Sequence, residues 1–100
     1  MQTIPIKDVP NQSLNVTLGG QSCQINLRVT LFGLFVDLYA NNALVAGGVV
    51  AQNLNPIVRS PSSGFLGDLV FIDSQGSSDP TSPGLGTRWD LVYLSASDLT

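Results

Sequence analysis

Apolar and polar residues alternate along most of this chain, and pairs of glycine or asparagine separate the alternating runs. Residues 13–18 alternate before Gly19-Gly20, and residues 24–31 alternate after it. A period of two on both sides of a glycine pair is typical of a β-hairpin with one buried face. The positions expected to face the core are Leu14, Val16, Leu18, Ile25, Leu27, Val29 and Leu31.

A second hairpin of this kind and a third pair of strands are also predicted. In "LFVDLYANNALVAGGVV", the pair Asn41-Asn42 predicts a tight turn between two strands, because asparagine tolerates a positive φ. Alternation places Leu34, Val36 and Leu38 on the core face and Phe35, Asp37 and Tyr39 on the other face. "GDLVFID" and "TRWDLVYLS" form the third predicted pair, and "TIPI" near the start is expected on a sheet edge because Pro5 cannot donate to a ladder.

These patterns predict an all-β fold: a small antiparallel β-sandwich or barrel of about six to seven strands built from hairpins. Glu is absent and Lys occurs once, so few strong helix formers remain apart from Leu and Ala. One hundred residues suffice for one domain. We expect residues 1–12 to form an extended arm or edge strand and residues 13–100 a single β domain. "QNLNPIVRSPSSG", with Pro56 and Pro61, is the long irregular crossing.

The charge inventory excludes several functional classes. The chain has four Lys and Arg residues against seven Asp, so its net charge is −3 and its charged fraction is 11%, compared with about 25% in ordinary soluble domains. Binding to nucleic acid or to an anionic membrane requires a basic patch, which this composition does not favour. No apolar run is long enough for a membrane span, and the start does not resemble a signal peptide. A single cysteine, Cys23, fits a reducing cytoplasm.

Candidate chemistry is sparse. The chain has no histidine, and we expect Cys23 to pack as a small hydrophobe. "IDSQG" loosely resembles the Asp-Thr-Gly turn of aspartic proteases, so a dimeric aspartyl hydrolase using Asp73 is one alternative. Asp73 and Asp79 could suggest calcium, yet "DSQGSSD" lacks the ligand spacing of an EF-hand and is better read as a solvated loop. We therefore expect no catalytic residue, no metal and no cofactor. Arg88, Asp90 and Asp68 are expected in a cross-strand charge pair or an interface contact.

Four blocks resemble one protein family. "IPI-x-x-VPNQ" opens the chain, "GLFVDLYANN" follows, and "GDLVFID-x-QG-x-SDP" and "GLG-x-RW-x-LVYL" lie towards its end. In this order, over nearly the whole chain, they resemble the baseplate plug proteins of tailed bacteriophages, namely myophages of the cyanophage type. The resemblance implies a structural protein of the virion, located in the tail baseplate and assembled in the cytoplasm of the host bacterium. The implied partners are tail-tube, hub, spike, sheath-initiator and wedge proteins, and further copies of this chain in a ring.

Two further alternatives concern surfaces. A carbohydrate- or small-ligand-binding β module could use Trp89 or Tyr93 as a stacking platform. Phe35 and Tyr39 could form an exposed aromatic pair, or a loop could cover that face of the strand. Interfaces prefer aromatic and arginine anchors. The candidate interface residues are Ile4, Ile6, Phe35, Tyr39, Asp73, Asp79, Arg88 and Trp89.

Overall fold

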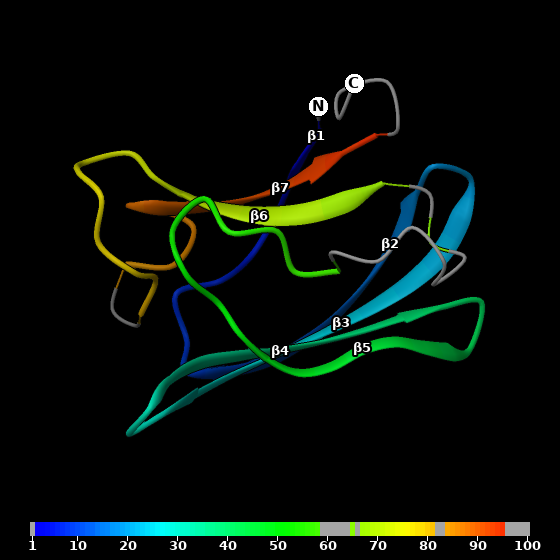
Figure 1. The fold of residues 1–100 in the computed structure, drawn as a ribbon, viewed down its shortest axis with the longest axis horizontal. Helices are drawn as coiled ribbons and strands as arrows, with labels where there is room; N and C mark the ends of the chain where they lie inside the picture. Colours follow the sequence, from blue (N-terminus) through cyan, green and yellow to red (C-terminus); the bar gives the residue numbers. More distant parts are fainter. Residues whose placement is uncertain (1, 59–64, 66, 82–83, 96–100) are drawn as a thin grey trace.

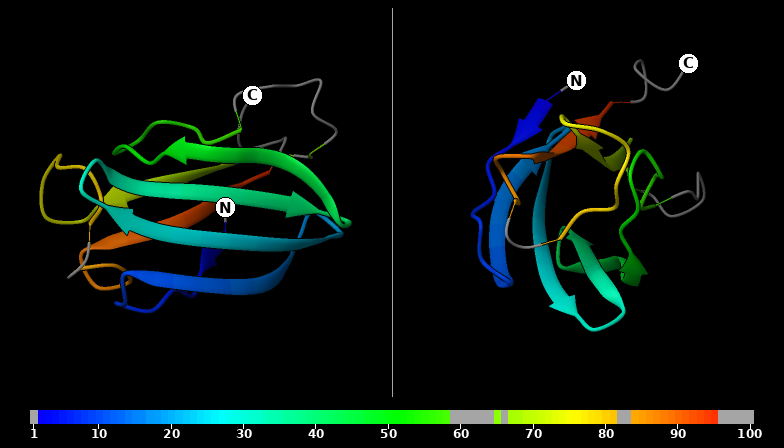
Figure 2. Two further views of the ribbon diagram at one scale, coloured as in Figure 1. Left: turned by 90° about the horizontal axis from the view of Figure 1, so that it is seen from below. Right: turned by 90° about the vertical axis from the view of Figure 1, so that its left-hand side faces the viewer.

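The computed structural model describes residues 2–58, 65, 67–81 and 84–95, and these form two antiparallel sheets (Figure 1). One sheet has the strand order β1-β7-β6 and the other β2-β3-β4-β5. The sheets pack face to face as a sandwich (Figure 2). No helix of the described residues is long and apolar enough to cross a membrane. The strands are β1 (Gln2–Ile4), β2 (Asn11–Leu18), β3 (Gln21–Thr30), β4 (Gly33–Ala40), β5 (Ala43–Val50), β6 (Asp68–Asp73) and β7 (Trp89–Leu94).

The four-stranded sheet is a meander of consecutive hairpins. Gly19 and Gly20 join β2 to β3 with φ values of 58° and 79°, and Asn41 and Asn42 join β4 to β5 with 52° and 66°. These left-handed conformations suit glycine and asparagine, and they match the twist of two-residue hairpins. Both predicted turns are therefore confirmed.

The three-stranded sheet is completed by segments that come from opposite ends of the chain. β7 lies between β6 and β1, and Ile4 of β1 pairs with Leu91 of β7. After β5, residues 51–58 cross between the two sheets and run along the edge of β6 (Figure 1). Leu54 and Ile57 donate their backbone N–H groups to the carbonyl oxygens of Phe71 and Leu69 at 2.8 and 2.9 Å. The crossing therefore covers the free edge of β6. Pro61 and the rest of residues 59–64 lie outside the described residues.

The core lies between the sheets and follows the alternating pattern. Leu34, Val36 and Leu38 are fully buried, as predicted. The prediction that Leu31 also faces the core is wrong, because the chain reverses at Leu31 and Phe32 and leaves both side chains in solvent. The all-β prediction is confirmed, with seven strands among the described residues.

The first residues of the chain belong to the sandwich. Ile4 is 1% exposed and joins the core, and Ile6 packs against it while half-buried. Asp8 Oδ1 accepts a hydrogen bond from the Gly84 N–H at 2.9 Å. Residues 2–8 are thus tied to β7 and to the loop that precedes it, and in this structure they do not project as a free arm.

Candidate functional site

The carboxylate of Asp73 lies at the centre of the polar stretch between β6 and β7. Arg88 donates from Nε to Oδ1 at 2.8 Å and from Nη2 to Oδ2 at 2.9 Å, which is a bidentate pair. The backbone N–H groups of Gln75 and Ser78 donate to Oδ1 and Oδ2, both at 2.9 Å. The Asp73 side chain is 0% exposed. Each carboxylate oxygen therefore accepts two hydrogen bonds from groups of the same loop.

This bonding fixes the protonation state of Asp73. The hydrogen bonds from Arg88, followed by those from Gln75 and Ser78, hold the pKa of Asp73 far below its ordinary value, against the opposing effect of burial. The same pairing raises the pKa of Arg88. An aspartic-protease mechanism needs a carboxyl group that shares a proton with a second carboxyl group. Asp73 is instead charged at neutral pH and, as a hydrogen-bond acceptor, holds the loop in place.

Trp89 completes this structural unit. Its indole Nε1 donates to the Ser78 carbonyl oxygen at 2.9 Å, and the Arg88 guanidinium carbon lies 4.6 Å from the centre of its ring. Trp89 and Tyr93 are both buried, and the Tyr93 ring meets Phe65 edge to face at 5.8 Å. Neither ring is available as a stacking platform for a ligand. The role that the ligand-binding alternative gave to Trp89 and Tyr93 is therefore wrong.

Other aspartates act in the same way as Asp73. Asp68 Oδ1 accepts the N–H groups of Val58 and Leu69 at 2.7 Å, and Asp79 Oδ1 accepts the Asn53 N–H at 3.0 Å. Acidic side chains that accept backbone N–H groups stabilise turns and irregular segments. In the described ranges, no three His, Cys, Asp or Glu side chains gather as a possible metal site. The aspartates of this region are therefore used to fasten loops to the sandwich.

Cys23 is also structural in this fold. Its side chain is buried in the core, and burial raises the pKa of the thiol. A thiol with a raised pKa is a poor nucleophile at neutral pH. The expectation that Cys23 packs as a small hydrophobe is confirmed.

The outer face of the four-stranded sheet combines aromatic, charged and amide side chains. Phe35 and Tyr39 lie on this face and are half-buried by their neighbours. Their burial is thus intermediate between the two expectations, which were an exposed aromatic pair and a face covered by a loop. The Arg28 guanidinium stacks over Phe35 at 5.9 Å and contacts Asp37 at 3.5 Å. Asp37 Oδ1 also accepts the Gly48 N–H at 2.7 Å, which pins the β-bulge of β5. This face is amphipathic and well ordered by its own side chains.

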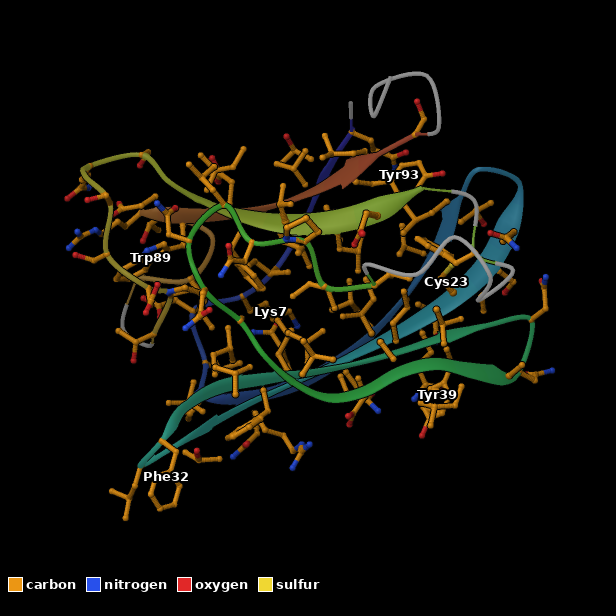
Figure 3. All side chains as sticks on the ribbon, viewed as in Figure 1. Lys7, Cys23, Phe32, Tyr39, Trp89 and Tyr93 are labelled. Atoms are coloured by element: carbon orange, nitrogen blue, oxygen red, sulfur yellow. The ribbon has the colours of Figure 1, made fainter. Side chains whose placement is uncertain are left out.

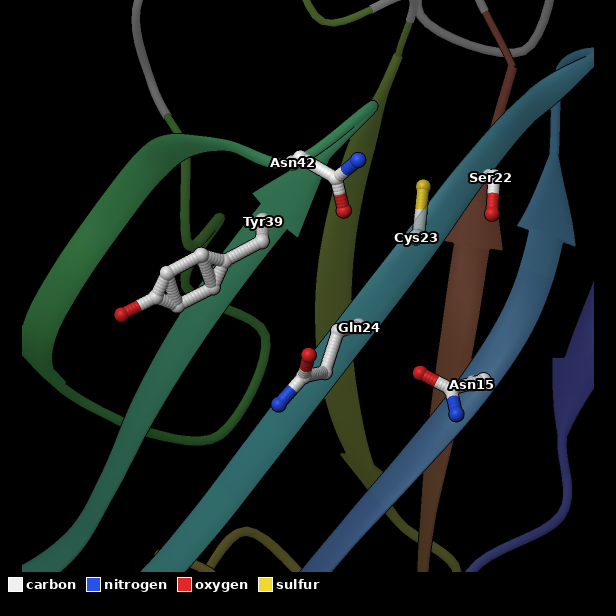
Figure 4. A pocket seen from close by; sticks show the side chains of 6 residues that line it. All are labelled: Asn15, Ser22, Cys23, Gln24, Tyr39 and Asn42. Atoms are coloured by element: carbon white, nitrogen blue, oxygen red, sulfur yellow. The ribbon is translucent and has the colours of Figure 1, made fainter.

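An amide network extends this face towards β2. The Asn26 Oδ1 accepts hydrogen bonds from Ser13 Oγ at 2.7 Å and from Gln24 Nε2 at 3.2 Å. Nearby lies an open hollow of about 260 Å³ (Figure 4). Its lining is mostly amide, hydroxyl and phenol groups: Asn15, Ser22, Cys23, Gln24, Tyr39 and Asn42. The hollow is smaller than the pockets that usually enclose a small molecule. We therefore describe it as an open depression on a polar face and not as a ligand pocket.

The candidate interface residues fall into two groups. Ile4, Asp73 and Trp89 are buried within the chain, so a contact through their side chains with another protein would require the sandwich to open. The inclusion of these three residues in an interface stays a prediction, as it does for the other five. Ile6, Phe35, Tyr39 and Arg88 are half-buried, and Asp79 is exposed. The candidate interface residues do not include the most exposed apolar residues, Leu31 and Phe32, which form the β3–β4 turn. Figure 3 shows Phe32 at the end of this hairpin.

Comparison with known families decides the identity of the chain. Residues 1–96 match the family described as cyanophage baseplate Pam3 plug gp18. The chain belongs to this family. None of the curated proteins matches it. The match confirms the resemblance carried by the four sequence blocks, which span the same region.

Membership of the baseplate plug family establishes the general function of this chain. It is a structural component of a phage baseplate and thus of the virion tail, where it interacts with other proteins of the baseplate or tail. A structural family favours a non-catalytic role. The geometry agrees with this role, because the candidate functional side chains of Asp73, Arg88 and Trp89 form hydrogen bonds within the sandwich.

Proposed function

We propose that this chain lies at the end of the tail tube in the baseplate of a contractile phage tail, where several copies form a ring. In this position it contacts tail-tube, hub, spike, sheath-initiator and wedge proteins, and it enters the particle during assembly in the host cytoplasm. The observation that carries the proposal is the family match over residues 1–96. The open outer face of the four-stranded sheet supports it, because that face offers aromatic anchors among amide and hydroxyl groups and the Arg28–Asp37 pair.

The edges of the sheet support a ring of copies. The order β2-β3-β4-β5 leaves β2 and β5 at opposite edges, and head-to-tail contacts around a ring need two different surfaces on each copy. β2 has eight residues without proline or a charged side chain, whereas exposed edge strands usually carry such blocking features. Pairing the β2 edge of one copy with the β5 edge of the next would continue the sheet from copy to copy.

Alternation of the ladder identifies the β2 groups that are open to such pairing. The Val29 N–H donates to the Pro10 carbonyl oxygen at 2.8 Å, so every second residue after Pro10 bonds to β3. The residues between them, Asn11, Ser13, Asn15 and Thr17, direct their backbone groups away from β3. Ser13→Pro would remove one outward N–H group and leave the β2–β3 ladder intact.

The test is complementation of a phage that lacks this gene, followed by quantification of the chain in purified particles. We expect the wild-type chain to enter baseplates at a fixed copy number. Ser13→Pro and the double variant Phe35→Ser/Tyr39→Ser are expected to enter poorly while keeping a folded circular dichroism spectrum. The conservative pair Phe35→Leu/Tyr39→Phe keeps the apolar contact and should restore entry. Absence of the wild-type chain from particles would contradict the proposed function. Normal entry of Ser13→Pro would contradict only the edge pairing.

A further inference from the structure

The β3–β4 turn differs from the other two turns of the same sheet. Gly19-Gly20 and Asn41-Asn42 are ordinary turn residues. The corresponding positions of the β3–β4 turn are Leu31 and Phe32, which are 99% and 85% exposed. Large apolar side chains in full contact with water contribute nothing to the stability of the fold. Their presence at the end of a hairpin needs a different physical reason.

The turn does not depend on Leu31 or Phe32 for its shape. Thr30 Oγ1 accepts the Phe32 N–H and donates to the Gly33 carbonyl oxygen, both at 3.1 Å. Gly33 has a φ of 124°, a region that a side chain would strain. Thr30 and Gly33 thus fix the backbone, and the two residues between them are held outwards in a defined position. A preorganised side chain loses less conformational entropy on binding.

Two more apolar residues flank the turn. Continuing the β2–β3 register beyond Pro10 and Val29 places Val9 beside Thr30, and Val9 is 38% exposed. On the other side, Val50 is 39% exposed and its Cγ1 lies 3.9 Å from the position of a Cβ at Gly33. Leu31, Phe32, Val9 and Val50 form what we call the apolar tip. Figure 3 shows Phe32 at the end of the hairpin, pointing away from both sheets. An apolar group that protrudes from one end of a domain is typical of a binding element.

We propose that the apolar tip docks into an apolar socket on a different protein of the tail. The proposal rests on the proposed function, since it requires the chain to be in the baseplate. A hairpin end that presents a leucine and a phenyl ring is convex, so it fits a concave apolar cavity. The tip itself carries no charged residue, and its occupant needs no complementary charge.

Two other occupants fit the tip less well. A lipid surface would require more than two inserted side chains, or basic residues beside them, for firm binding. The nearest cation along β3 is Arg28, which already contacts Asp37, and the net charge of the chain is −3. A second copy of this chain would need an apolar cavity of its own. The hollow beside Tyr39 that is described above is lined mainly by amide and hydroxyl groups, which do not suit a phenyl ring.

Site-specific photocrosslinking identifies the occupant directly. p-Benzoylphenylalanine is introduced at position 32 in the complementing gene, and purified particles are irradiated and analysed by mass spectrometry. Position 54 is the matched control, because Leu54 is also exposed but lies along β6 in the other sheet. We expect position 32 to crosslink to one tail protein other than this chain, at least about tenfold more than position 54. A crosslink to a second copy or to lipid, or none above the control, would overturn the proposal.

The double variant Leu31→Ser/Phe32→Ser tests the energetic importance of the tip. Because both side chains are exposed, the melting temperature of the isolated chain should change by less than about 4 °C. Incorporation into particles should fall at least about tenfold, while Leu54→Asn, which removes an exposed leucine elsewhere, should enter normally. Normal entry of the double variant would overturn the tip proposal and leave the proposed function intact. If the wild-type chain also fails to enter, both proposals are overturned.

Discussion

Replacing Trp89 by alanine tests whether the loop between β6 and β7 is a structural unit or an exposed binding platform. The Trp89 ring is 4% exposed, and its Nε1 donates to the Ser78 carbonyl oxygen. Gly84 lies so close to the ring that a Cβ at that position would collide with it. The substitution therefore removes a closely packed ring and one of the hydrogen bonds that hold the loop.

The expected cost follows from this burial. Truncation of a buried tryptophan to alanine destabilises a protein by about 3–5 kcal/mol, because apolar contacts are lost and a cavity remains. A domain of this size has a total stability of about 5–15 kcal/mol. Since each kcal/mol shifts the melting temperature by about 4–8 °C, Trp89→Ala should melt roughly 12–40 °C lower than the wild type. Trp89→Phe keeps much of the volume but loses the indole N–H, and we expect a decrease of roughly 5–10 °C.

Thermal melting followed by far-UV circular dichroism is the suitable assay, because the substitution removes the only tryptophan and with it the best fluorophore. Phe32→Ala is the matched control: it also truncates an aromatic residue, but one that is 85% exposed. Its melting temperature should lie within about 4 °C of the wild type. If Trp89→Ala and Phe32→Ala shifted the melting temperature by similar amounts, the Trp89 ring would not be a member of the core and our interpretation of the loop would fail.

Two further substitutions and one deletion test other parts of the structure by thermal melting. Asp73→Asn should lower the melting temperature at pH 7 by roughly 5–10 °C. Because folding lowers the pKa of Asp73, the charged carboxylate contributes its full stabilisation above the ordinary aspartate pKa of about 3.9, and this stabilisation is lost as the pH falls below that value. The difference in melting temperature between Asp73→Asn and the wild type should therefore narrow from pH 5 to pH 2. A difference that stays constant over this range would contradict the lowered pKa of Asp73. Leu54 has a φ of 63° with an exposed side chain, so Leu54→Asn should stabilise the fold by about 0.5–1 kcal/mol, and a lower melting temperature would contradict the strain argument. Deletion of residues 1–9 should lower the melting temperature by more than about 10 °C, because it removes β1 and the buried Ile4; an unchanged value would show that β1 is dispensable.

Much of the fold was predictable because hairpins are local. Alternation with a period of two specifies which face of each strand is buried, and the turn pairs Gly19-Gly20 and Asn41-Asn42 specify where the chain reverses. Both signals lie within about twenty residues of sequence, so no long-range information is needed. The pairing of β6 with β7 was also visible, although 15 residues separate the two strands, because both are strongly apolar.

Two features were beyond the reach of these patterns. The burial of Ile4 depends on β1 pairing with β7 at the far end of the chain, and a sequence without such a pairing signal reads equally well as a free arm. The alternation of β3 continues through Leu31 and therefore predicts a core position for this residue. The turn signal at that point consists of Thr30 and Gly33, one on each side of the apolar pair, and the hydrogen bonds of the Thr30 hydroxyl become apparent only in three dimensions.

Five of the seven aspartates in this acidic chain have a structural role. Asp8, Asp37, Asp68, Asp73 and Asp79 each accept at least one backbone N–H group, and these bonds fasten loops and a bulge to the two sheets. These carboxylates thus stabilise the conformation of the loops and of the bulge. Apart from the Arg28–Asp37 pair, the outer face and the apolar tip present amide, aromatic and aliphatic groups, whose contacts depend little on ionic strength. A protein that must stay in place in a particle through changes of salt outside the cell benefits from contacts of this kind.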